Sequence, residues 1–269
     1  VDEAVVRRWS VPIVAGSLAG AIAASHLDAH VLALVFCIVA LAAALKMLLA
    51  QMGGLAEQQL DDAIDALSRR DTTLADRVIQ NDERIDMLER QIEEKAILTI
   101  AKRQPMARDL REIMVAIRVA SDLERIGDLA KNTAKRTHAM SDQLPRKLMA
   151  GVTRMGRLAQ VELKNILDAY SRTDAEMAME VWRSDEELDA LYNSIFRELL
   201  TYMMEDPRNI SLCTHLLFGA KNMERIGDHA TNIAENIYYL VQGKPLSEER
   251  PKKDVTSAMR VDIEGSDDR

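Results

Sequence analysis

An internal repeat constrains this sequence more than any other feature, because two copies of one unit must share a fold. Residues 52–56 (MGGLA) return as residues 155–159 (MGRLA), 103 positions later. Residues 124–128 (ERIGD) return unchanged as residues 224–228, 100 positions later. Matches in the same order along both copies are not expected by chance, so we interpret the chain beyond residue 50 as a duplication.

Helical periodicity and composition predict an all-α fold. Glycine and proline number only 11 and 6, and aromatic residues make up 4% of the chain, which is unlike a β-sheet protein. Asp71 and Asp174 stand as N-cap residues at equivalent points of the two copies. We predict duplicated three-helix bundles with six long helices, at 47–69, 72–102, 107–139, 145–171, 174–205 and 208–241. The predicted divisions are residues 51–141 for the first repeat, 142–243 for the second, and 244–269 for a disordered tail.

The first 50 residues differ from the rest in being strongly apolar. Residues 31–45 form an uninterrupted apolar run, and a helix over 31–50 would be just long enough to span a bilayer. We expect residues 1–50 to form an apolar helical hairpin, which contacts a membrane or tethers the chain to it through residues 11–50. It resembles the last two membrane helices of a TauE/SafE-type permease, which would make it a natural fusion or a reading-frame artefact. The alternatives are a signal peptide in residues 1–25 and a pair of buried core helices.

Charge and cysteine content exclude several classes of function. The net charge of −8 argues against nucleic-acid binding, which requires clustered basic residues. The two cysteines, Cys37 and Cys213, are far apart in sequence, so neither a disulfide scaffold nor a thiolate zinc site is expected.

Repeated carboxylate pairs are the candidate metal ligands. Each pair has i, i+4 spacing, which places two carboxylates on one helix face at a cost in repulsion that a bound cation would remove. Oxygen ligands without cysteine or histidine suit magnesium, manganese, calcium or iron. Gly127 and Gly227 lie inside the third helix of each repeat, which suggests close helix approach or ligand access. Asn132 and Asn232 extend the same stripe by one turn. The predicted ligands are Asp82, Asp86, Glu124, Asp128, Asp185, Asp189, Glu224 and Asp228.

The repeat resembles the PhoU family, the accessory regulators of bacterial phosphate-specific transport. The resemblance rests on the motifs MGGLAEQQLDDAI at 52–64, QPMARDLREI at 104–113, DLERIGDLAKNTAKR at 122–136 and NMERIGDHATNIAENIYYLVQGK at 222–244. It covers about residues 50–244 and implies metal clusters, of iron, manganese, magnesium or zinc, held by the eight acidic residues. It also implies a cytoplasmic protein, often a homodimer, that is peripheral to the phosphate ABC transporter. Such a protein would repress the phosphate-starvation response by signalling to a sensor histidine kinase.

Two other functions stay open on the sequence alone. One is a structural helical adaptor whose acidic faces are solvated and hold no metal. The other is a di-metal carboxylate enzyme, which would need Glu-x-x-His on two helices. No histidine here has a glutamate three residues before it, and no phosphate-binding loop or Ser/His/Asp grouping is present. The sequence therefore favours a regulator that is not an enzyme.

Overall fold

The computed structural model describes residues 29–103, 105–140 and 146–248. The chain divides into two compact units, residues 1–44 and 45–269. In the first unit the described residues form the beginning of helix α2 (Ala29–Arg69), which continues into the second unit. No helix in the described residues is long and apolar enough to cross a membrane. The membrane hairpin and its resemblance to a permease therefore find no support, and residues 11–28 of it lie outside the described residues.

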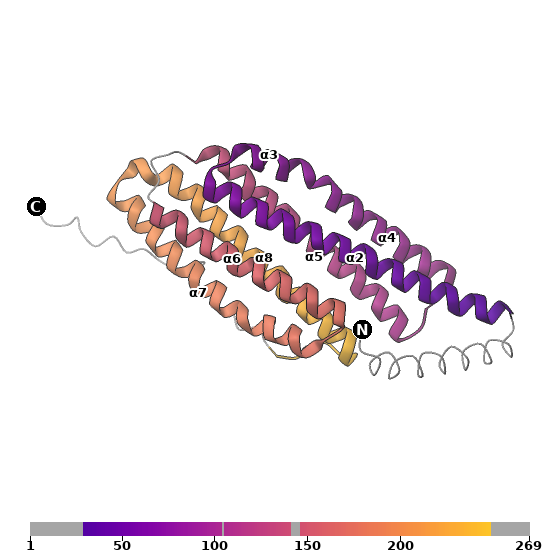
Figure 1. Ribbon diagram of the computed structural model, residues 1–269. Helices are drawn as coiled ribbons and strands as arrows, with labels where there is room; N and C mark the ends of the chain where they lie inside the picture. The colour runs from indigo at the N-terminus through magenta and orange to yellow at the C-terminus, as the bar shows by residue number, and fades with distance from the viewer. Residues whose placement is uncertain (1–28, 104, 141–145, 249–269) are drawn as a thin grey trace, which may run out of the picture. The chain divides into compact units, whose positions relative to one another are not determined.

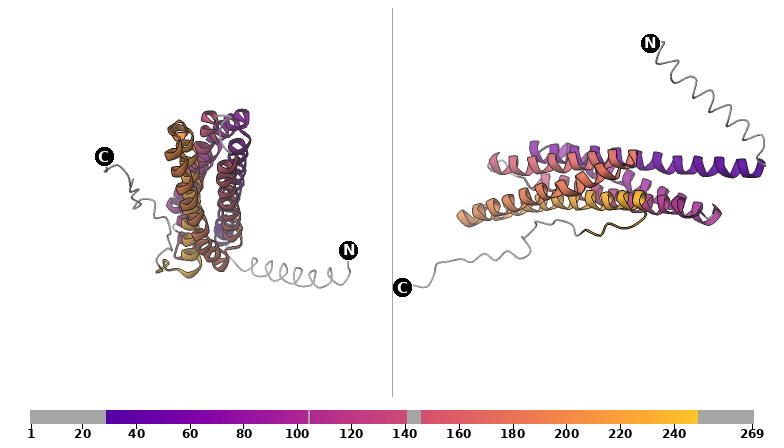
Figure 2. Two further views of the ribbon diagram at one scale, coloured as in Figure 1. Left: turned by 90° about the vertical axis from the view of Figure 1, so that its left-hand side faces the viewer. Right: turned by 90° about the horizontal axis from the view of Figure 1, so that it is seen from below.

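The second unit is built from long helices that run alongside one another (Figures 1 and 2). In the described part of the chain, every regular element is helical, as the repeat and the composition predict. The α-helices that follow α2 are α3 (Thr72–Asn81), α4 (Glu83–Arg103), α5 (Arg108–Arg136), α6 (Arg146–Arg172), α7 (Ala175–Glu205) and α8 (Ile210–Gln242). Two short 3₁₀ turns, η1 (Thr137–Ala139) and η2 (Pro207–Asn209), follow α5 and α7.

The predicted helix over residues 72–102 is present but divided at Asp82. Helix α3 ends at Asn81 and α4 begins at Glu83, while the amide of Ile85 donates to the Asp82 carbonyl at 2.9 Å. That bond spans three residues instead of four, which tightens the helix locally. The equivalent helix of the second repeat, α7, is continuous.

The two copies enter their second helices through the same turn. Arg70 and Thr173 both have positive φ, of 57° and 56°, and end the preceding helix. The next residue then caps the following helix: the Asp71 carboxylate accepts from the amide of Leu74, and the Asp174 carboxylate accepts from the amides of Glu176 and Met177. The prediction that Asp71 and Asp174 are N-caps is confirmed.

The packing of α2 against α6 relates the two repeats by an approximate two-fold symmetry. A Cβ at Gly53 of α2 would lie 2.6 Å from Leu167 of α6, and a Cβ at Gly156 of α6 would lie 2.8 Å from Ile64 of α2. These two contacts are equivalent, because Gly53 and Gly156 are 103 residues apart, and so are Ile64 and Leu167. Equivalent apolar residues of the two helices are fully buried, namely Met52 and Met155, Ala56 and Ala159, and Leu60 and Leu163. The core is therefore duplicated together with the sequence.

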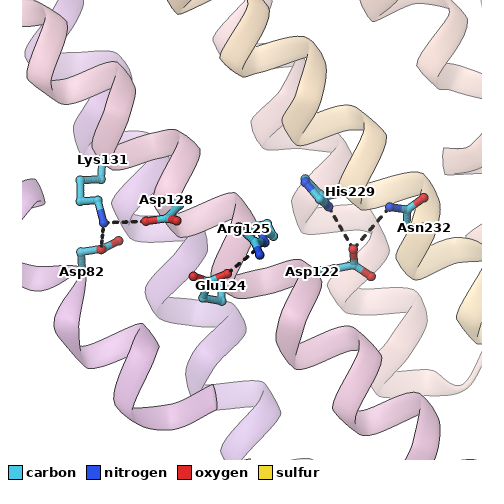
Figure 3. Close-up of polar contacts among 8 residues, drawn as sticks. All are labelled: Asp82, Asp122, Glu124, Arg125, Asp128, Lys131, His229 and Asn232. Atoms are coloured by element: carbon cyan, nitrogen blue, oxygen red, sulfur yellow. Dashed lines mark hydrogen bonds and ion pairs between the residues drawn. The ribbon is translucent and has the colours of Figure 1, made fainter. Parts of the chain in front are cut away.

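Helices α5 and α8 also pack against each other, and polar side chains lie between them. The Asp122 carboxylate of α5 is 3.0 Å from Nδ1 of His229 and accepts from Asn232 at 3.4 Å (Figure 3). The Asn222 amide of α8 donates to the Thr133 hydroxyl of α5 at 3.2 Å. The two repeats are therefore joined through a second pair of helices, and Asn232 contacts Asp122 of the other repeat.

Candidate metal centre

The first repeat brings Asp82 and Asp128 together around a lysine. Lys131 of α5 donates to Asp128 Oδ1 at 2.6 Å, and its ammonium also contacts Asp82, which lies at the junction of α3 and α4 (Figure 3). The second Asp82 oxygen accepts from the Gln59 amide of α2 at 2.8 Å. The same amide reaches the Gly127 carbonyl at 3.2 Å. Three helical segments therefore meet at one buried carboxylate.

Lys131 is held in its charged form by these two partners. Burial alone would lower the pKa of Lys131, but the hydrogen bonds from its ammonium to Asp128 and Asp82 raise that pKa above its ordinary value. Asp82 is only 4% exposed, so its charge needs such a partner inside the protein. The lysine is the positive charge that makes this buried carboxylate tolerable.

The other two predicted ligands of the first repeat carry charge that is less well compensated. Burial and the neighbouring charge of Asp82 raise the pKa of Asp86. Burial and the charge of Asp128 likewise raise the pKa of Glu124, whose carboxylate has Arg125 3.5 Å away (Figure 3). Both shifts mean that the folded protein disfavours the ionised form of these groups. A cation bound beside them would reverse that preference.

The carboxylates of the second repeat are buried more completely. Asp185 and Asp189 of α7 are 1% and 2% exposed, and Glu224 of α8 is 2% exposed. Lys221, one turn before Glu224, donates to it at 2.9 Å and lies over the ring of Tyr192. Burial of several carboxylates within a single three-helix bundle is costly unless cations neutralise them.

Gly227 makes room for two of the buried carboxylate oxygens. A Cβ at this position would lie 2.6 Å from Asp185 Oδ1 and 3.3 Å from Glu162 Oε2, and 2.5 Å from a methyl of Leu188. Glu162 belongs to α6 and is 3% exposed. The glycine therefore allows carboxylates from two other helices to approach α8, as expected for close approach or ligand access.

The donor set of the second repeat fits a hard or borderline cation, because it consists of carboxylate oxygens. In the first repeat, the Lys131 ammonium is the cation between Asp82 and Asp128. Within the described residues, no group of three or more His, Cys, Asp or Glu side chains is already arranged to hold a metal ion. Metal ligation by the eight predicted residues accordingly remains a prediction.

Gln59, Glu162 and Lys131 belong to these clusters, but sequence reasoning did not include them among the candidate ligands. Gln59 and Glu162 are separated by the same 103 residues as the rest of the repeat, so the repeat offset could have paired them. Their role depends on contact between different helices, which helical spacing within one segment does not reveal. The sequence shows Lys131 as a neighbour of the Glu124 and Asp128 pair, but it does not show that Lys131 also contacts Asp82.

Comparison with known proteins decides the family. A family model described as the PhoU domain matches residues 49–137 and 152–237, one match in each repeat. The chain belongs to the PhoU family. The phosphate-specific transport system accessory protein PhoU homolog of Rhizobium meliloti is 59% identical over 212 residues, covering 78% of this chain and 90% of the relative. The Escherichia coli PhoU accessory protein is 42% identical over 193 residues, covering 72% of this chain and 80% of the relative.

Solved PhoU structures have the same fold. The crystal structure of PhoU from Pseudomonas aeruginosa aligns with a TM-score of 0.71 at 39% identity, over 76% of this chain and 99% of that one. PhoU from Streptococcus pneumoniae, described as a phosphate transport system regulatory protein, aligns with a TM-score of 0.73 at 26% identity. The resemblance of residues 50–244 to the PhoU family is therefore confirmed, and so is the all-helical bundle fold.

Proposed function

We propose that this PhoU-family chain is an accessory regulator of phosphate-specific transport that binds metal ions through its repeated carboxylate pairs. It would restrain the phosphate-starvation response by coupling a phosphate ABC transporter to a sensor histidine kinase. The names of its relatives support the link to phosphate transport. The observation that carries the metal proposal is the burial of Asp185, Asp189 and Glu224 in one bundle. The expected metal is iron, manganese, magnesium or zinc.

The chain's own residues suggest what a bound metal would change. The carboxylates of the second repeat come from α7 and α8, with Glu162 from α6 beside them. A bound cation would neutralise their charge and draw these helices together, and no catalytic step is needed for that effect. We therefore place this chain among regulators and not enzymes. We further propose that it acts as a homodimer, peripheral to or tethered at the cytoplasmic face of the inner membrane, and does not bind nucleic acid.

A structural adaptor without metal is the second candidate. The observation that favours it is Lys131, which neutralises Asp82 and Asp128 without any added ion. An adaptor would keep the bundle and its partner surfaces but would not respond to metal.

Metal content and stability distinguish the two candidates. We expect purified protein to carry metal by elemental analysis, and chelator treatment to lower its thermal midpoint. The double variant Asp185→Asn, Asp189→Asn should lose metal, whereas Glu187→Gln, an exposed residue on the same helix, should retain it. If the purified chain holds no metal and chelator leaves its midpoint unchanged, the adaptor is correct. A phosphate-starvation reporter in a bacterium lacking its own PhoU protein tests the regulatory role separately.

A further inference from the structure

We propose that a hollow between the end of α2 and the beginning of α6 binds a small phosphate-bearing anion through arginine side chains. This site is separate from the carboxylate pairs, since none of the predicted metal ligands lines it. It therefore goes beyond the proposed function. The group that it recognises is a phosphate, either alone or in a diphosphate, and the titrations described below distinguish the two.

The hollow is large enough for a small molecule and is lined by positive charge. Its volume is about 800 Å³, within the range of about 300–1,000 Å³ that is typical of small-molecule sites. The lining comes from the end of α2, the residue after it, and the first turns of α6. Four arginines line it, namely Arg69, Arg70, Arg154 and Arg157, together with the uncharged residues Ser68, Met149, Ala150 and Thr153. In a chain with a net charge of −8, this lining concentrates positive charge at one place.

Two of the arginines are held in place by carboxylates of α2. Asp65 pairs with Nη2 of Arg69 at 3.0 Å and also accepts from the guanidinium of Arg157. Arg157 donates in addition to Asp61, and to Gln160 Oε1 at 3.0 Å. An arginine has five N–H donors, so these bonds leave donors on both guanidinium groups. The carboxylates therefore fix the positions of two groups that can still bind an anion.

The duplication shows that the other two arginines are not required for packing. Arg70 corresponds to Thr173 of the second copy, and Arg154 corresponds to Gln51 of the first, in each case 103 residues away. Arg70 and Thr173 end their helices with the same positive φ, so the turn forms with either residue. Arg154 is exposed and lies one turn before Arg157 on the same face of α6. Positive charge is thus added at one end of the α2–α6 pair only.

The chemistry of the lining favours phosphate over other anions. The hydroxyls of Ser68 and Thr153 donate within their own helices, to the carbonyls of Asp65 at 3.1 Å and Met149 at 2.9 Å. Recognition therefore depends on the guanidinium groups, whose planar forks match the oxygens of a phosphate. A phosphate monoester carries a charge of about −1.5 to −2 at pH 7 and has three free oxygens. It can therefore bond to guanidinium groups from two helices at once, which a single carboxylate does less well.

Isothermal titration calorimetry of the full chain with sodium pyrophosphate tests this proposal. We expect saturable binding in the parent protein. Arg154→Gln, which copies Gln51, should weaken it by about tenfold, as expected for the loss of one charge-assisted hydrogen bond. Arg70→Thr, which copies Thr173, should weaken it similarly, and the double variant should weaken it further. Pyrophosphate bound to metal ions at the carboxylate pairs would not depend on Arg154, so this variant isolates the hollow.

Arg172→Gln is the matched control. Arg172 is the equivalent of Arg69 at the other end of α6, and it is exposed. The variant removes the same charge from outside the hollow, so it should leave pyrophosphate binding unchanged. Circular dichroism of each variant checks that the bundle is folded.

Titrations with inorganic phosphate and with citrate identify the recognised group. Phosphate binding as tightly as pyrophosphate would show that one phosphate group is sufficient, and tighter pyrophosphate binding would show that a diphosphate is preferred; both support the proposal. Citrate, a polyanion without phosphate, should bind at least tenfold more weakly than pyrophosphate.

Three results would overturn the proposal. The first is no saturable binding of either phosphate or pyrophosphate. The second is equal weakening in Arg154→Gln and Arg172→Gln, which would show attraction by overall charge and not by the hollow. The third is citrate binding as tight as that of pyrophosphate. Each of these leaves metal binding by the carboxylate pairs untouched, because elemental analysis tests it separately.

Discussion

Three glycines inside helices face very different surroundings, and replacing each with alanine measures the space beside the candidate metal ligands. A Cβ at Gly54 of α2 would meet no atom within 4 Å. At Gly127 of α5 the nearest atom would be a methyl of Ile85 at 3.0 Å. At Gly227 of α8 the nearest atoms would be a Leu188 methyl at 2.5 Å and Asp185 Oδ1 at 2.6 Å.

Two opposing terms decide the free energy of unfolding in each variant. Alanine is favoured over glycine inside a helix by about 1 kcal/mol. Gly54→Ala should gain that amount, since nothing opposes it. The free energy of unfolding of Gly127→Ala should be unchanged or higher by up to about 1 kcal/mol, because the terminal methyl of Ile85 needs to move only slightly. Gly227→Ala should lose up to about 2 kcal/mol, since overpacking a filled site costs about 1–3 kcal/mol and exceeds the helix gain.

Urea unfolding of the three variants in chelator, followed by circular dichroism, gives the order of stability. We expect Gly54→Ala to be the most stable, then Gly127→Ala, then the parent, and Gly227→Ala to be the least stable. Thermal midpoints should move by about 2–4 °C per kcal/mol for a unit of this size. If Gly227→Ala proves as stable as Gly54→Ala, the carboxylates of the second repeat do not pack against this glycine, and the reasoning from its surroundings is wrong.

Two further variants test the N-cap of α7 and the raised pKa of Glu124. Asp174→Ala removes the acceptor of the amides of Glu176 and Met177, and should lower the free energy of unfolding by about 1 kcal/mol in urea; an unchanged midpoint would contradict the capping assignment. Glu124→Gln tests the sign of a titration. Burial and Asp128 raise the pKa of Glu124 in the folded protein, so the folded state holds this proton more tightly, and the parent loses stability as the pH rises from the ordinary pKa through the raised one. The variant lacks that loss. In chelator, the free energy of unfolding of Glu124→Gln relative to the parent should therefore increase as the pH rises across this window. The expected increase is a few tenths of a kcal/mol, from the relieved i, i+4 repulsion. A difference independent of pH would refute the assignment.

The sequence predicted the elements of this fold well, because the relevant signals are local or repeated. Helical periodicity located the helices except for the start of α2, which lies at Ala29 and not at residue 47. Asp71 and Asp174 marked the beginnings of two helices correctly. The duplication required equivalent packing in both halves, and the reciprocal contacts Gly53–Leu167 and Gly156–Ile64 show how that packing is achieved. The division of the second helix at Asp82 was not predicted, because the apolar period continues across it.

The candidate centre was predicted only in part, since its contacts are between helices. Spacing within α5 puts Glu124, Asp128 and Lys131 on one face, but it does not indicate that the lysine also reaches Asp82. Nor does spacing show that the amide of Gln59 would complete the surroundings of that carboxylate. Such contacts depend on how far two helices are apart and how they are rotated about their axes, which a single-segment pattern does not specify.

The duplicated bundle separates the requirement to fill the apolar core from the requirement to neutralise buried carboxylates. At the apolar positions the copies stay alike in burial, as Leu60 and Leu163 show, because a change in volume there would leave a cavity or an overlap. At the polar positions they differ, because a buried carboxylate can be neutralised either by a side-chain ammonium or by a bound ion. In the first copy the Lys131 ammonium contacts Asp82 and Asp128, and in the second copy the Lys221 ammonium pairs with Glu224. The apolar contacts of the two copies are therefore kept alike, while each copy places its lysine at a different point of its carboxylate cluster.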